Sequence, residues 1–161
     1  MEGVNMKKYD IEESEIFSLL TSKQIALLSD IAVIKNFEEG EVIYDQKEKA
    51  DSIFILLEGE VSLRLPGKND ISAETFSSEI EKIYKHGTLF GTNYLFGVKR
   101  YVSRAKVLKS AKIMILDGEK FLNIIRENKS EFVIMAYLAK VYFHRYVNAM
   151  KEIEKYSEKV C

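Results

Sequence analysis

The middle of the chain, about residues 32–116, is divided into short β-rich runs by glycine and turn residues. Valine, isoleucine, leucine and phenylalanine dominate these runs, which are therefore candidate strands. A tight turn is expected at 58–60, a second turn at 66–70, and a polar loop over 68–82. Short strands at regular spacing are typical of a barrel, sandwich or roll rather than a parallel α/β sheet. The candidate strands lie at 33–34, 42–44, 53–57, 61–65, 102–108 and 112–116.

Helices are expected on both sides of this β zone. Residues 11–31 carry apolar side chains at helical spacing, and Thr21 followed by Gln24 is a capping box that divides them into two short helices. Residues 117–161 are also predicted to be helical, and Asp117 is a candidate N-cap of a short first helix. The pattern therefore predicts a mainly β protein with flanking helices.

The last helix is predicted to be long, because Asn128 with Glu131 is a further capping box and neither glycine nor proline follows it. Residues at 133, 137, 141 and 142 are expected to pack on the β zone. A second stripe recurs at alternating four- and three-residue steps, as in an a/d seam. That stripe consists of Phe132, Ala136, Ala139, Phe143, Tyr146, Met150 and Ile153.

The length of this helix decides between two readings of the stripe. About thirty residues span about 45 Å, which is longer than a domain of this size can cover. We therefore expect a homodimer, rather than one subunit that buries the whole apolar surface of the helix within itself. The dimer seam is predicted at Ala139, Phe143, Tyr146, Met150 and Ile153.

Composition limits the classes of function. With 161 residues and a net charge of −1, the chain fits one domain without a field that attracts nucleic acid or an anionic membrane. A single cysteine, the absence of a long apolar run and an acidic N-terminal segment favour a cytoplasmic location. The two histidines, His86 and His144, are isolated, so no metal is expected. No catalytic constellation is visible, and we predict that the protein is not an enzyme.

Residues 86–105 contain the candidate ligand-binding segment. Gly87, Phe90 and Gly91 form a Gly-x-x-Phe-Gly frame, which is followed by a short apolar segment, a basic pair and a return to strand. This layout places backbone N–H groups where an anion such as phosphate can bind. Gly91, Thr92 and Asn93 are the candidate donors, and a plain turn that only shapes the roll is the alternative.

Three ordered segments resemble the cyclic nucleotide-binding domain family, which includes catabolite-activator-type regulators and kinase regulatory subunits. They are FEEGEVI at 37–43, ADSIFILLEGEV at 50–61 and GxxFG at 87–91, and the similarity covers about 16–157. The resemblance implies one domain over 1–161, with N-terminal helices at 11–31, a jelly-roll-like β-roll at 32–116 and C-terminal helices at 117–161. It also implies that a phosphate-binding cassette lies between the later strands.

The resemblance also indicates which side chains would hold a cyclic nucleotide. The family's glutamate position falls on Thr92, and its phosphate-binding arginine position falls on Tyr101, with Arg100 as a neighbouring substitute for that role. Val102 completes the candidate cassette, and Tyr146 lies near the position at which relatives contact the base. Arg100 as a solvated surface charge and Tyr146 as plain seam packing are the alternatives.

The function implied is that of a non-enzymatic, homodimeric effector sensor that requires no cofactor and binds a cyclic nucleotide or another anionic effector. The alternative is a ligand-free scaffold or protein-docking module, with the pocket filled by Tyr94, Phe96 and Tyr101. The sequence ends where the helix-turn-helix domain of catabolite-activator-type regulators would begin, so we expect this segment to make no nucleic-acid contact. It is either the sensory half of a longer regulator or a stand-alone module.

Overall fold

The computed structural model describes residues 15–65 and 78–160. Helices precede and follow a set of antiparallel strands, as the sequence predicted. In chain order the elements are α1 (Glu15–Ser18), α2 (Ser22–Ile31), β1 (Val33–Phe37), β2 (Val42–Tyr44), β3 (Ser52–Leu65), β4 (Ser78–Ile83), β5 (Leu89–Phe90), the 3-10 helix η4 (Thr92–Phe96), β6 (Arg104–Asp117), α3 (Gly118–Glu127) and α4 (Glu131–Val160).

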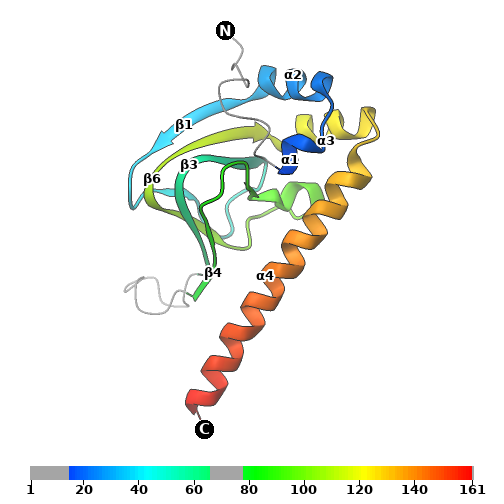
Figure 1. Cartoon of the computed structure of the whole chain (residues 1–161). Coiled ribbons are helices and arrows are strands. Elements are labelled where there is room, and N and C mark those ends of the chain that lie inside the picture. The colour runs from blue at the N-terminus through cyan, green and yellow to red at the C-terminus, as the bar shows by residue number, and fades with distance from the viewer. Residues whose placement is uncertain (1–14, 66–77, 161) are drawn as a thin grey trace.

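The strands form one antiparallel sheet in the order β1-β6-β3-β4, with β2 added beside β6 and β5 beside β3. The long central pair runs from Ser52 opposite Asp117 to Arg64 opposite Arg104. The sheet curves into a roll, α1, α2 and α3 gather at one end, and α4 passes along the roll and continues beyond it (Figure 1). This is the β-roll with flanking helices that the sequence predicted. Within the described residues, no helix is long and apolar enough to cross a membrane.

The predicted turn at 58–60 is wrong, because β3 continues through it for 14 residues. Gly59 has a φ of +94°, and a Cβ atom there would lie 2.4 Å from the carbonyl oxygen of Ser110. The register against β6 shifts on both sides of this glycine. Gly59 therefore lets β3 bend closely over β6 instead of reversing the chain. In the same way, the two candidate strands at 102–108 and 112–116 are parts of one strand, β6.

The predicted loop over 68–82 is also partly wrong. Its last residues belong to β4, which pairs with β3 from Val61 opposite Ile83 to Leu65 opposite Ser78. The remainder of that loop and the predicted turn at 66–70 lie outside the described residues, as do residues 11–14 of the N-terminal helical zone. The edge strand β4 contacts α4.

Helix boundaries follow local capping in two of the three predicted places. Thr21 and Gln24 form the predicted capping box, and the Asp117 side chain accepts a hydrogen bond from the Lys120 backbone. Asn128 instead closes α3, where its side-chain amide donates to the carbonyl of Ile124 at 2.9 Å. The capping box predicted at Asn128 is therefore wrong, and α4 begins three residues later.

Two apolar clusters stabilise the domain. One joins the helices to the end of the roll and includes Phe17, Leu28, Phe121 and Leu138. The other fills the interior of the roll, where aromatic rings stack on one another. The rings of this second cluster belong to Phe37, Tyr44, Phe54, Phe90 and Tyr101.

Candidate functional site

A cavity of about 250 Å³ lies between the roll and α4, beside the predicted cassette. Most of its lining is apolar or aromatic, and Arg145 is the single charged side chain among the described residues that line it. Ligand sites typically combine such apolar walls with a few placed polar groups. The lining residues are Tyr44, Leu63, Ile80, Gly91, Asn93, Val102, Ser103, Tyr142, Arg145, Tyr146 and Ala149.

The cassette begins at a left-handed Gly91, with a φ of +64°. A Cβ atom at this position would lie 2.7 Å from the Phe54 ring, so the close packing of β5 on β3 requires glycine. Thr92 follows in η4 and is fully buried. Its hydroxyl lies 2.8 Å from the phenol oxygen of Tyr142. Thr92 therefore links the cassette to α4 rather than standing free for a ribose hydroxyl.

The structure does not bring Arg100 or Tyr101 into the cavity lining. The Arg100 guanidinium donates to the carbonyl of Lys47 at 2.6 Å on the exposed surface. Tyr101 is buried inside the roll, where its ring stacks on Tyr44 at a centroid distance of 3.9 Å. Of the predicted ligand-binding residues, the lining contains Gly91, Asn93, Val102 and Tyr146. Their roles in binding remain predictions.

The phenol of Tyr101 has a structural partner. It donates to the carbonyl of Ser52 at 2.8 Å. Burial raises the pKa of Tyr101 to about 12, although the hydrogen bond to Ser52 acts in the opposite direction. The phenol is therefore neutral near pH 7 and remains a hydrogen-bond donor.

Replacing Tyr101 by phenylalanine should lower the free energy of unfolding by about 1 kcal/mol, because the Ser52 carbonyl loses its donor while the ring stack remains. Urea denaturation of both proteins at the same concentration measures this difference. Tyr84→Phe is a control, because that side chain is 63% exposed. Equal unfolding free energies for Tyr101→Phe and the unsubstituted protein would contradict the assignment of this hydrogen bond.

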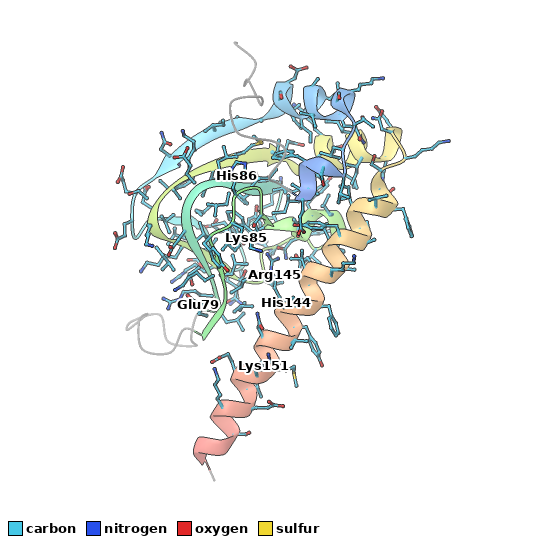
Figure 2. All side chains as sticks on the ribbon, viewed as in Figure 1. Glu79, Lys85, His86, His144, Arg145 and Lys151 are labelled. Carbon is cyan, nitrogen blue, oxygen red and sulfur yellow. The ribbon has the colours of Figure 1, made fainter. Side chains whose placement is uncertain are left out.

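Arg145 is the charged residue of the cavity lining, and the sequence did not predict it as a site residue. It lies on the side of α4 that faces the roll (Figure 2). Its side chain is only 8% exposed and forms an ion pair with Glu81 of β4. One terminal nitrogen, Nη2, donates to the carbonyl of Leu89 at 3.2 Å. The guanidinium also lies 5.3 Å from the centroid of the Tyr142 ring. The cavity therefore has a buried cation, but α4 supplies it and the cassette does not.

Tyr44 and Ser103 contribute neutral polar groups to the lining. Burial raises the pKa of Tyr44 far above its ordinary value, while a hydrogen bond with the Ser103 side chain and the nearby Arg145 charge partly offset this rise. Because it stays protonated, the Tyr44 phenol can donate to a ligand or to Ser103. The polar groups of the lining are thus one guanidinium, one amide, one aliphatic hydroxyl and three phenols. They belong to Arg145, Asn93, Ser103, Tyr44, Tyr142 and Tyr146.

The three residues expected to fill an empty pocket in the ligand-free alternative do not line this cavity. Tyr101 lies inside the roll, and Phe96 is 47% exposed. The Phe96 ring meets Tyr142 edge-on at a centroid distance of 5.3 Å. Tyr94 packs near Gly118, where a Cβ atom would lie 2.8 Å from its ring.

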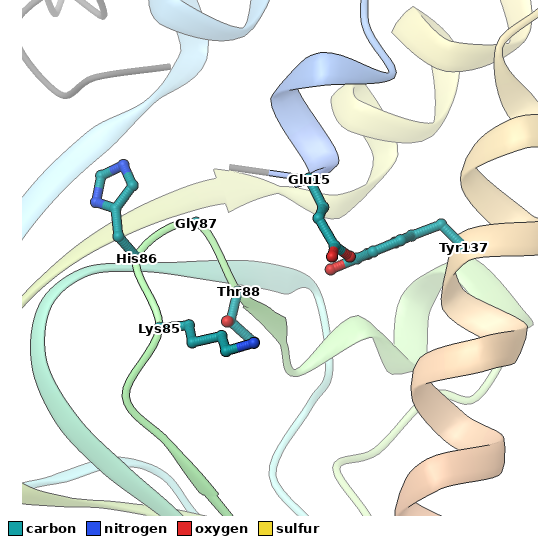
Figure 3. A pocket seen from close by; sticks show the side chains of 6 residues that line it. All are labelled: Glu15, Lys85, His86, Gly87, Thr88 and Tyr137. Atoms are coloured by element: carbon teal, nitrogen blue, oxygen red, sulfur yellow. The ribbon is translucent and has the colours of Figure 1, made fainter. Parts of the chain in front are cut away.

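A second cavity, of about 310 Å³, lies between α1, the turn before β5 and α4 (Figure 3). The side chains of Glu15 and Tyr137 converge there, whereas His86 points away from them (Figure 3). The Nδ1 atom of His86 lies 2.9 Å from the carbonyl of Leu57. That contact fixes the turn against β3 and gives His86 a structural role. Within the described ranges, no group of three metal-binding side chains occurs.

The chain folds as an antiparallel β-roll with a cavity between a short cassette and a long terminal helix. The family model of the cyclic nucleotide-binding domain matches residues 34–128. The chain therefore belongs to the cyclic nucleotide-binding domain family.

Individual relatives agree with this assignment. A cGMP-dependent protein kinase of Toxoplasma gondii is 26% identical over 150 residues, which cover 86% of this chain and 15% of the kinase. The regulatory subunit of a cAMP-independent protein kinase A from Trypanosoma brucei superposes with a TM-score of 0.72 at 15% identity, over 91% of this chain and 50% of that one. Thermus thermophilus catabolite activator protein superposes with a TM-score of 0.64 at 18% identity, over 86% of this chain and 61% of that protein. This chain thus spans only about 15% of the curated kinase.

Proposed function

We propose that this domain is a non-enzymatic, homodimeric sensor that binds a cyclic nucleotide or another anionic effector between the cassette and α4. The observation that carries the proposal is the buried Arg145 guanidinium at the wall of an otherwise apolar cavity. A guanidinium in a sheltered site binds phosphate well, because its donors form a rigid fork and its charge is little screened.

The cavity of about 250 Å³ is smaller than a typical ligand site of roughly 300–1,000 Å³. We therefore propose that α4 or the cassette shifts when a nucleotide binds. Tyr142, Arg145 and Ala149 of α4 all line the cavity, so this helix is the element that ligand entry would displace. Ligand binding would then act by selecting a different packing of α4 on the roll.

The same helix carries the predicted dimer seam, which meets the cavity at Tyr146 and otherwise lies outside its lining. Phe143 is 68% exposed, Tyr146 61% and Ile153 59%. Large apolar side chains in a row on one helix face are typical of an interaction surface. We propose that a second copy of α4 packs on this seam. A shift of α4 on the roll would then change the relative orientation of the two subunits.

Isothermal titration of the purified protein with cyclic AMP and with cyclic GMP tests the sensor proposal. We expect saturable heat for at least one nucleotide, with one site per chain and a Kd on the order of micromolar. No heat with either nucleotide at millimolar concentration would remove the cyclic-nucleotide version of the proposal.

A specific observation favours the alternative of a ligand-free scaffold or docking module. Arg145 is already satisfied by Glu81 and by the Leu89 carbonyl, so the cavity carries no unpaired charge without a ligand. Thermal melting separates the two proposals. A sensor is stabilised by saturating nucleotide through mass action, whereas the melting temperature of a ligand-free scaffold does not change.

A further inference from the structure

We propose that the Glu81 carboxylate is a built-in substitute for the anionic group of the effector, which displaces it from Arg145 on binding. This inference rests on the proposed sensor function and assigns the anion-binding and competing residues of that site. The Arg145 side chain is 8% exposed and that of Glu81 24%, so their ion pair is largely buried. Arg145 lines the cavity, whereas Glu81 lines the neighbouring groove between β4 and α4.

The Arg145 guanidinium needs an anionic partner both with and without a bound effector. A charge this deeply buried is costly unless it is paired and hydrogen-bonded. Among the described residues that line the cavity, Arg145 is the only charged one, and Thr92 and Tyr101 place no charge at the family's two binding positions. An anionic effector in this cavity would therefore bind Arg145, and we expect it to compete with Glu81 for the charge of the guanidinium.

The geometry of β4 gives Glu81 an alternative position. Glu81 pairs with Leu63 of β3, and the register between the two strands shifts immediately after this pair. Such irregularities redirect side chains. Glu81 also borders a polar groove of about 470 Å³ between β4 and α4. The basic side chains that line this groove belong to Lys82, His144, Lys151 and Lys155.

The groove also contains the carboxylates of Glu79 and Glu152, and Glu152 is paired with Lys155. Lys82 and Lys151 are therefore the cations that a displaced Glu81 carboxylate would approach. His144 and Lys151 lie on α4 beside the strand that carries Glu81 (Figure 2). In this exchange Arg145 of α4 would give up its ion pair with Glu81 of β4 and pair with the ligand instead. A direct contact between the strand and the helix would then be lost. Effector binding would in this way be coupled to the packing of α4.

The cavity also defines the chemical class of the effector. The guanidinium and the Ser103 hydroxyl suit one compact anionic group, such as a phosphodiester. The remaining walls, which include Leu63, Val102 and Tyr142, suit a flat apolar or aromatic body. A cyclic nucleotide has both parts, whereas a highly charged polyanion would meet only one cation.

Titration of the Glu81→Gln variant with cyclic AMP and cyclic GMP tests the competition. We expect about tenfold tighter binding than in the unsubstituted protein, because the ligand no longer displaces a charged competitor. Arg145→Met should weaken binding by about 100-fold or more, because a buried ionic contact is lost. The Glu79→Gln variant is the matched control. It removes the same charge from the same strand, but Glu79 accepts its hydrogen bond from Ser62. We expect its affinity to change by less than about twofold.

The outcomes separate this inference from the sensor proposal. If the unsubstituted protein binds a nucleotide and Glu81→Gln binds no more tightly, the inference fails and the sensor proposal stands. If only Glu81→Gln binds, the competition is confirmed and the unsubstituted domain is not a sensor of that nucleotide. If neither binds, the inference and the cyclic-nucleotide version of the sensor proposal both fail. Thermal melting confirms that each variant is folded, and ligand-induced stabilisation of Glu81→Gln gives a second reading of its affinity.

Discussion

Replacing Gly59 by alanine is expected to lower the free energy of unfolding by about 4 kcal/mol. A residue with a side chain is strained at the Gly59 φ of +94°. The new Cβ atom would also lie 2.4 Å from the Ser110 carbonyl oxygen and 2.6 Å from the Ala111 Cα, both of which are backbone atoms that cannot rotate away. For a domain of this size, the melting temperature should fall by roughly 12 °C. Thermal and urea unfolding measure the effect at one protein concentration.

The variants Gly40→Ala and Gly97→Ala separate backbone strain at a positive φ from steric overlap of the new Cβ atom. These glycines have φ values of +88° and +70°, but no atom lies within 4 Å of an added Cβ at either position. They should therefore show only the backbone strain, about 1 kcal/mol each. If Gly59→Ala cost no more than these controls, the close crossing of β3 over β6 would be contradicted.

Replacing Phe143 by glutamate is expected to convert the proposed dimer into a monomer. Phe143 is 68% exposed in one subunit and occupies the middle of the predicted seam. A carboxylate there would be buried without a partner in a dimer, and its own copy would oppose it, so dimerisation should weaken by about 100-fold or more. Sedimentation should then give the 18.6 kDa of one chain instead of twice that mass.

Lys140→Glu is the matched control for charge on α4. This residue is exposed and lies outside the seam, so its substitution should leave the dimer mass unchanged. An unchanged mass in Phe143→Glu, or a monomeric unsubstituted protein at micromolar concentration, would contradict the coiled seam. Because Phe143 does not line the cavity, the variant also tests whether nucleotide binding requires the dimer.

Local signals in the sequence were sufficient for much of the fold. The capping box at Thr21 and the N-cap at Asp117 act within one helical turn, and both are present as predicted. The segment around Gly59 shows where such signals fail. A Glu-Gly-Glu sequence between two apolar runs suits a hairpin turn and a bent strand equally well. The choice depends on how closely Ser110 approaches, which is a contact between residues far apart in the chain.

The glycine and phenylalanine frame of the cassette could also be predicted from local sequence. The side chains that line the cavity could not. Counting along the chain placed Arg100 and Tyr101 at the ligand. The pairing of the chain at Lys49 with Arg100 turns the Arg100 side chain to the surface. Tyr101 enters the roll because its ring can stack on Tyr44. Neither outcome follows from spacing, since both depend on the partner segment at 44–49.

Arg145 could have been recognised from helical spacing. Ile134 and Leu138 are fully buried, and Arg145 follows Leu138 by seven residues on the same face of α4. An arginine in register with a buried stripe indicates a buried cation that needs a partner. The residue of α4 that the sequence predicted near the ligand was Tyr146, which also belongs to the exposed seam. The partner, Glu81, lies in an edge strand that the sequence did not predict.

A crystal structure of the protein grown with millimolar cyclic AMP or cyclic GMP tests the central claim most directly. The account predicts a nucleotide between the cassette and α4, its phosphate within hydrogen-bond distance of the Arg145 guanidinium, Glu81 turned towards the β4–α4 groove and α4 displaced from the roll. An empty cavity with Arg145 still paired to Glu81, or a nucleotide held away from Arg145, would contradict it.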